Sequence, residues 1–244
     1  MGLSAAKACV AAGAQVVVVG RDPETTTAAE VVLGNRVLAF TGEAGDPTTA
    51  ERAIGEAVAA FGGFHGLYHV AGGSGRKYGD GPLHEMSDEG WEQTIALNLT
   101  SVMYSNRAAV RQFLAQETGG SILNMGSVLA WSPSPRHFAT HAYAAAKAAI
   151  AGFSRSLAAT YAPRDIRVNV IAPAVVNTPM AQRAAESPEV QNFIATKQPL
   201  QGGRIGHAED LDAAVVWFLS DGARFVTGQT LAIDGGWSVS EGQG

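Results

Sequence analysis

The fold of this chain is decided by three consecutive stretches, SILNM (residues 121–125), YAAAKAAIAGFSRSLAATY (residues 143–161) and RVNVI (residues 167–171). The first and the third are short, largely apolar runs, which are typical of buried strands. The stretch between them is rich in alanine and long enough for several helical turns. A strand, a helix and a second strand in this order form the crossover that joins neighbouring parallel strands.

The same alternation continues on both sides of this unit. Further strands are expected over residues 16–19, 36–40, 67–70 and 230–233. Three helix starts are marked by a capping residue followed by proline, namely Asp22-Pro23, Asp46-Pro47 and Ser187-Pro188. We therefore predict an α/β fold, a doubly wound parallel sheet with helices on both faces, in a single domain over residues 1–244.

Bulk composition narrows the class of protein. The chain has 244 residues, of which 46% are hydrophobic, and this suits one domain with a sizeable core. A net charge of −5 gives no basic surface for nucleic acid or anionic lipid, so a small-molecule partner is favoured. The sole cysteine, Cys9, excludes an internal disulfide and fits a reducing compartment. Because no apolar stretch is long enough to span a membrane and no signal peptide is evident, we expect a cytoplasmic protein.

Three side chains with complementary chemistry follow the strand over residues 121–125. Ser127 comes directly after that strand, and Tyr143 and Lys147 lie one turn apart on the next helix. In a parallel sheet, ligands bind beyond the carboxyl ends of the strands, so all three can converge on one site. A nearby ammonium favours a phenolate, so we expect Lys147 to lower the pKa of Tyr143 and make it an acid/base. The alternative is an ordinary pair on the helix surface.

The chain resembles the short-chain dehydrogenase/reductase family of the compact type, from Gly2 to about Trp237. The resemblance implies an oxidoreductase that transfers a hydride between a nicotinamide cofactor and a secondary alcohol or ketone. The matching pieces are Gly2-Leu3-Ser4 with Gly13-Ala14, Ala71-Gly72, Asn98, Ser127, Tyr143 with Lys147, Arg167-Val168-Asn169, Pro173, Thr178, Gly228-Gln229 and Asp234-Gly235-Gly236.

This resemblance also implies roles for individual residues. Tyr143 would be the acid/base, Ser127 would position the substrate oxygen, and Lys147 would also hold the nicotinamide ribose. Asn98 would anchor a water that relays protons from Lys147; its alternative interpretation is a coincidental Asn-x-Thr inside a helix. Cofactor contacts are implied for Gly2 near the phosphates, Glu43 and Ala44 at the adenine, Ala71 and Gly72 at the ribose, and Pro173, Val176 and Thr178 at the carboxamide.

The largest departure from the family lies at the front of the sequence. Family members begin with a strand and then a Thr-Gly-x-x-x-Gly-x-Gly loop that approaches the pyrophosphate. Met1-Gly2 matches only the last two positions of that loop, so the first strand and most of the loop are absent. Our hypothesis is that Met1 is an internal methionine of a longer reading frame. The alternative is a short protein with impaired cofactor binding.

Smaller departures concern the surroundings of the site. His69-Val70 stands where the family usually has Asn-Asn, which affects the hydrogen bonds that brace the strand rather than the reaction. The segment between Ser127 and Tyr143 is a few residues longer than the spacing common in the family. The segment from Thr178 to Gly206 breaks the strand–helix rhythm and is interpreted either as a mobile flap over the site or as a plain surface loop.

Cofactor choice depends on the end of the second strand of the family fold, where an acidic residue binds a ribose diol and an arginine accepts a 2′-phosphate. Gly20 takes the acidic position here and Arg21 follows it. NADP(H) is therefore favoured. NAD(H) stays open if Arg21 is only solvated and Asp22 is only a helix cap.

The sequence says less about the substrate. Trp131, Phe138, Met180, Phe193 and Leu200 suggest a largely apolar pocket, and Arg136 is a candidate partner for an anionic group.

Three other functions are possible alternatives, namely a zinc hydrolase, a serine hydrolase and a non-enzymatic scaffold or regulatory subunit. His137 and His141 have helical spacing but Phe138 stands where a zinc hydrolase has its glutamate, and the residues around Ser127 lack the glycines of a nucleophile elbow. The remaining rival is a scaffold or regulatory subunit that keeps the fold and has lost dinucleotide binding. Family resemblance further suggests a homotetramer, with the helices around residues 98–115 and 143–161 and the 234–236 stretch at its contacts.

Overall fold

The secondary structure follows the predicted alternation. The computed structural model describes residues 1–242, and all six predicted strands are present, with boundaries within two residues of those expected. The strands are β1 (Val16–Gly20), β2 (Val37–Thr41), β3 (Gly66–His69), β4 (Gly120–Met125), β5 (Ile166–Pro173) and β6 (Thr230–Ile233).

Helices connect the strands and begin where the sequence indicated. The side chains of Asp22, Asp46 and Ser187 each accept a hydrogen bond from a backbone N–H in the first turn, which confirms the three predicted caps. The helices are α1 (Gly2–Ala11), α2 (Pro23–Leu33), α3 (Pro47–Phe61), α4 (Asp88–Ile95), α5 (Ser101–Gln116), α6 (Pro135–Phe138), α7 (His141–Tyr161), α8 (Gln182–Glu186), α9 (Pro188–Lys197), α10 (Leu200–Gly203) and α11 (Asp212–Leu219).

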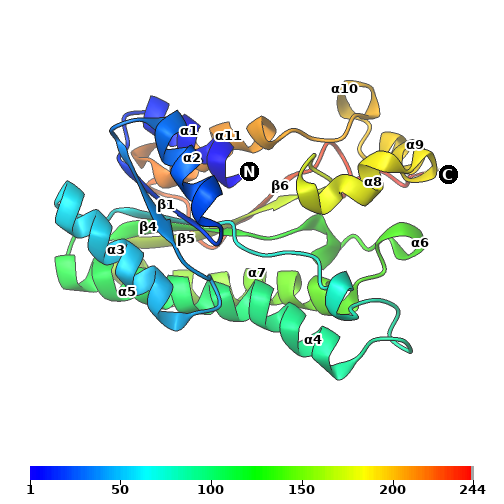
Figure 1. Cartoon of the computed structure of the whole chain (residues 1–244), viewed down its shortest axis with the longest axis horizontal. Helices are drawn as coiled ribbons and strands as arrows, with labels where there is room; N and C mark the ends of the chain where they lie inside the picture. The colour runs from blue at the N-terminus through cyan, green and yellow to red at the C-terminus, as the bar shows by residue number, and fades with distance from the viewer. Residues whose placement is uncertain (243–244) are drawn as a thin grey trace.

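Helices cover both faces of the strands, as predicted (Figure 1). Helices α3, α5 and α7 lie on one face, and α1, α2 and α11 lie on the other (Figure 1). Strand β4 shows why both faces need a cover, because its side chains alternate between them. Ile122 packs with Phe113 of α5, whereas Leu123 and Met125 pack with residues of α11 such as Phe218. Each such side chain stabilises the fold by about 1.5–3 kcal/mol when fully buried.

The strands form two parallel sheets rather than the single sheet predicted. Strand β1 pairs with β2, and the second sheet has the order β3-β4-β5-β6. The division between β1 and β3 falls where the family resemblance places a central first strand, which has no counterpart among the described residues. Helix contacts join the two parts, since α1 touches both β1 and α11 and α3 touches both β1 and α5.

The segment after β5 forms a helical excursion over one end of the second sheet (Figure 1). It contains α8, α9 and α10 and is closed at its base by a parallel bridge between Val176 and Gly206. The backbone N–H of Asn177 donates to Gly206 O at 2.8 Å, and the N–H of Gly206 donates to Val175 O at 3.0 Å. This base anchors the segment beside the carboxyl end of β5.

Candidate active site

Ser127 and Tyr143 meet beyond the carboxyl end of β4. Ser127 follows that strand by two residues, and Tyr143 lies in the first turn of α7. Their hydroxyl groups are hydrogen-bonded to each other, and Ser127 Oγ also accepts from the backbone N–H of Leu129 at 3.2 Å. The Ser127 side chain is thus fixed on one side by its own backbone and points to the Tyr143 phenol on the other.

Lys147 joins this pair from the next turn of α7. Its Nζ donates to Met125 O, the last carbonyl of β4, at 2.9 Å and lies 5.5 Å from the centroid of the Tyr143 ring. The side chain is only 3% exposed. Burial lowers the pKa of Lys147 to about 8, because a charged ammonium loses its hydration there.

The direction of the Tyr143 pKa shift differs from the sequence expectation. Burial raises the pKa of the Tyr143 phenol, and the hydrogen bond with Ser127 offsets part of this rise. The lowering that we expected from Lys147 does not prevail, since desolvation of the phenolate outweighs the favourable contacts. The phenol is therefore protonated at neutral pH.

Asn98 reaches the same place from a local irregularity between α4 and α5. Residues Ala96–Thr100 form a π-helical turn, a feature that often occurs at functional sites. The amide of Asn98 is fully buried; it accepts from Gly73 N at 3.1 Å and donates to Gly73 O and Thr94 O, both at 2.9 Å. A Cβ atom on Gly72 would lie 2.8 Å from Asn98 Oδ1 and 3.4 Å from Lys147 Nζ. Both side chains therefore close on Gly72, which has to be a glycine.

His69 replaces the bracing that the family's asparagines were expected to provide. Its Nδ1 lies 2.7 Å from Ser105 Oγ, and its Nε2 lies 3.1 Å from Ala71 O. Burial, with a smaller effect of the Lys147 charge, lowers the pKa of His69 to about 4, so the ring is neutral at physiological pH. His69 thus supports the Ala71-Gly72 loop, although its side chain differs from the asparagine that is usual in the family.

Asp80 is a site residue that the sequence analysis missed. The carboxylate is buried and accepts from the backbone N–H groups of Ala142 and Tyr143, both at 3.0 Å. Thr140, at the N-cap of α7, makes no side-chain cap of its own. Asp80 therefore caps α7 from a distant loop and fixes the turn that carries Tyr143.

Ser127, Tyr143 and Lys147 border a cavity of about 230 Å³. Of the residues predicted from the sequence, Gly72, Pro173, Val176 and Thr178 line it together with Ser127, Tyr143 and Lys147. Met1 also lines it, whereas Asn98, Gly2, Arg21, Glu43, Ala44 and Ala71 do not. The catalytic and carboxamide-side candidates are thus brought together, and the adenine-side candidates lie elsewhere, at the ends of β1 and β2 and the start of α1.

The predicted apolar wall is correct only in part. Phe138 and Met180 line the cavity, together with the buried Trp237. Phe193 instead packs against Trp237, with ring centroids 5.7 Å apart. Trp131 and Leu200 are 47% and 66% exposed and belong to the surface. The sequence does not show in which direction the side chain of a loop residue points, so it could not separate the cavity lining from the surface.

The end of β1 has a physical reason to lack an acidic residue. A Cβ atom on Gly20 would lie 2.5 Å from Thr26 Cγ2, so the Thr26 side chain would have to shift to admit any side chain there. The Asp22 carboxylate accepts from Glu24 N at 2.9 Å and serves as the helix cap. Arg21 is exposed and forms no ion pair with any residue in the described part of the chain.

The cationic groups at the cavity differ from the one expected. Arg136 forms an exposed ion pair with Glu189 at 2.7 Å and does not line the cavity, so its candidacy as an anion partner was wrong. Arg76 and Arg183 line it instead. Arg76 lies after β3 and Arg183 lies on α8, so their proximity depends on how these two distant segments fold together.

Two further features of residues 1–242 bear on the alternative functions. No cluster of three or more His, Cys, Asp or Glu side chains in this range is placed to hold a metal ion. None of its helices combines the length and the apolar character that crossing a membrane requires. His137 is buried against Phe193, and His141 is exposed.

Comparison with known proteins places this geometry in context. A family model described as enoyl-(acyl carrier protein) reductase matches residues 1–238. The 2-(S)-hydroxypropyl-CoM dehydrogenase 3 of Xanthobacter autotrophicus is 35% identical over 246 residues, which cover 98% of this chain and 92% of that protein.

Two solved structures match over nearly the whole chain. A short-chain type dehydrogenase/reductase from Mycobacterium ulcerans has a TM-score of 0.89 and 31% identity, over 99% of this chain and 87% of the other. A gluconate 5-dehydrogenase from Burkholderia cenocepacia J2315, in complex with NADP and tartrate, has a TM-score of 0.87 and 26% identity, over 98% and 91%.

Proposed function

Because the chain belongs to the short-chain dehydrogenase/reductase family of NAD(P)-dependent oxidoreductases, we propose that it interconverts a small secondary alcohol and the corresponding ketone. The observation that carries this proposal is the convergence of Ser127, Tyr143 and Lys147 on one cavity. The names of relatives support the substrate class, since they contain a hydroxypropyl group and gluconate, both of which carry secondary alcohols.

The proton chemistry follows from the hydrogen bonds of the site. In the reductive direction the Tyr143 phenol donates its proton to the carbonyl oxygen of the ketone, which the Ser127 hydroxyl holds. The raised pKa of Tyr143 suits this step, because the phenol is protonated at neutral pH. A bound nicotinamide nucleotide supplies the hydride to the carbonyl carbon, or accepts it in the reverse reaction.

Lys147 and Asn98 return the proton to Tyr143. Lys147 Nζ lies 5.5 Å from the centroid of the Tyr143 ring, and it shares Gly72 as a neighbour with the Asn98 amide. A water bound at Asn98 would connect this buried pair with solvent. The π-helical turn serves this purpose by directing Asn98 inward.

The residues around the cavity fit a nicotinamide nucleotide. Lys147, Pro173, Val176 and Thr178 border the space for the nicotinamide end, and Gly72 leaves room beside Lys147. Ala71 would contact the ribose, Glu43 and Ala44 the adenine, and Gly2 the phosphates. We propose NADP(H) as the preferred form, with NAD(H) as the alternative, because Gly20 stands in the acidic position, close to the Thr26 side chain, and Arg21 forms no ion pair within residues 1–242. The relative solved with NADP is consistent with this preference.

A panel of small ketones and secondary alcohols tests the proposal. The absorbance of the reduced nicotinamide is followed with NADPH and NADH for reduction and with the oxidised forms for oxidation. We expect turnover of at least one pair, with its kcat/KM lowered at least about tenfold by Ser127→Ala. Ser134→Ala is the matched control, because Ser134 is buried outside the cavity lining. Turnover that is indifferent to Ser127→Ala would refute the site.

A further inference from the structure

Two arginines that line the cavity converge on one backbone carbonyl, and neither forms an ion pair with another residue of the range 1–242. Arg76 lies in the loop after β3, and Arg183 lies on α8. The guanidinium of Arg183 donates to His137 O at 2.8 Å, and that of Arg76 donates to the same oxygen at 3.3 Å. One carbonyl thus holds two like charges close together.

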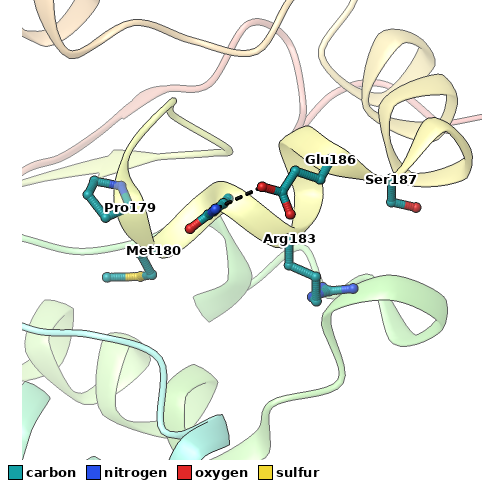
Figure 2. A pocket seen from close by; sticks show the side chains of 6 residues that line it. Pro179, Met180, Arg183, Glu186 and Ser187 are labelled. Carbon is teal, nitrogen blue, oxygen red and sulfur yellow. Dashed lines mark hydrogen bonds between the residues drawn. The ribbon is translucent and has the colours of Figure 1, made fainter.

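The acidic residues nearby are engaged elsewhere. Glu186 on α8 accepts from Gln182 Nε2 at 2.8 Å, and Figure 2 shows that it leaves the helix in a different direction from Arg183. Glu189 pairs with Arg136, and Asp80 accepts from two backbone N–H groups of α7. Within residues 1–242, neither Arg76 nor Arg183 forms an ion pair.

The two charges also act on one another. The pKa of the Arg76 guanidinium is lowered, first by burial and next by the charge of Arg183, while Asp80 raises it. Arg183 additionally packs over the Phe138 ring at 5.7 Å, and Phe138 lines the cavity as well. Like charges placed together at a partly desolvated site are stabilised when an anion binds between them, and guanidinium groups can bind carboxylate or sulfonate oxygens in a bidentate manner.

We propose that Arg76 and Arg183 form a subsite for an anionic group of the substrate, so that this chain acts on secondary alcohols and ketones that carry a carboxylate or a sulfonate. This inference rests on the proposed function, and it names the substrate class of the same cavity. Both arginines border the cavity that contains Ser127, Tyr143 and Lys147. The reacting carbon of the substrate would lie at these three residues, and its anionic group would lie at the two arginines.

A series of matched substrates tests the subsite. The series consists of straight-chain methyl carbinols that end in a carboxylate, with one to five methylene groups between the two functions, and of their methyl esters. For wild-type protein we expect kcat/KM for at least one acid to exceed that of its ester by about 10- to 100-fold. The double variant Arg76→Gln, Arg183→Gln should lose most of this preference, because kcat/KM for the acid falls much further than kcat/KM for the ester. Arg136→Gln, which removes an exposed cation outside the cavity, should keep it.

The comparison of acid and ester distinguishes a substrate-binding role of the two arginines from a purely structural role. If the arginines only anchor His137, their replacement lowers kcat/KM for acid and ester alike, and this result would overturn the proposal. Equal values for acid and ester in the wild-type protein would do so without any variant.

A binding measurement tests the anionic subsite independently of the dehydrogenase activity. If no alcohol is oxidised, calorimetric titration of the same acids into wild-type and double-variant protein decides it. Binding that disappears in the variant supports the subsite even though the dehydrogenase assignment fails. Absence of binding, or equal binding by both proteins, overturns it.

Discussion

Replacement of Tyr143 by phenylalanine is expected to lower kcat by about 10²–10⁴-fold, with the affinity for NADPH nearly unchanged. The substitution removes the hydroxyl group that we propose exchanges a proton with the substrate oxygen, and it leaves the ring that lies 5.5 Å from Lys147 Nζ. The loss should therefore appear in kcat rather than in cofactor binding. Steady-state kinetics with the best substrate, together with a fluorescence titration of NADPH, measures both quantities.

Tyr161 supplies the control for this experiment. It lies at the far end of the same helix and packs among hydrophobic residues, so Tyr161→Phe should leave turnover within the range of the wild type. If the protein were a scaffold or regulatory subunit, no function would change with Tyr143→Phe. Unaltered turnover in that variant would show that another group carries the proton.

Replacement of Lys147 by methionine should have two opposite effects. Turnover should fall by about 10²-fold or more, because the ammonium that serves Tyr143 is lost. Stability at pH 7 should rise by about 1–2 kcal/mol, because burial of the ammonium lowers the pKa of Lys147 to about 8 and thus opposes folding of the charged form. The hydrogen bond to Met125 O is lost as well, which offsets part of the gain.

The difference in stability between Lys147→Met and the wild type should depend on pH. Between about pH 8 and the ordinary value of 10.5, the unfolded chain binds more protons at Lys147 than the folded protein does, so wild-type stability rises with pH in this window. The advantage of Lys147→Met should be fully present below pH 8 and should shrink above it. Denaturant unfolding at pH 7 and pH 9.5 measures the difference, with the exposed Lys7→Met as control. A less stable Lys147→Met at pH 7 would contradict the account.

The strands, the helix starts and the face of α7 that carries Tyr143 and Lys147 were predictable because each depends on local sequence. Strands such as β4 are short apolar runs, and the caps at Asp22, Asp46 and Ser187 need only the residue and the proline after it. The spacing of Tyr143 and Lys147 fixes their common face in any helix. The position of Ser127 relative to them follows from the rule that parallel strands present their carboxyl ends together.

Other features depend on contacts that no local pattern encodes. Asp80 reaches the start of α7 across 62 positions of the chain, and Arg76 and Arg183 reach His137 O across 61 and 46. Arg136, which the sequence offered as a candidate partner for an anionic group, instead pairs with Glu189 of α9, and this contact depends on how the excursion after β5 folds. Similarly, the support that His69 gives to Ala71 became evident only from the position of Ser105 on α5.

The direction of the Tyr143 pKa illustrates a different limit. From the sequence, the neighbouring Lys147 predicted a lowered value, because the effect of a nearby charge follows from spacing. Burial acts in the opposite direction, and it depends on all the elements packed around the phenol. The outcome favours a protonated Tyr143, which serves ketone reduction more directly than alcohol oxidation.

The most direct test of the central claim is a fluorescence titration of the purified 244-residue protein with NADPH and with NADH. We expect saturable binding of both nucleotides or of NADPH alone, with the lower dissociation constant for NADPH. Absence of saturable binding of either nucleotide to folded protein would contradict the assignment of this cavity to a nicotinamide-dependent dehydrogenase.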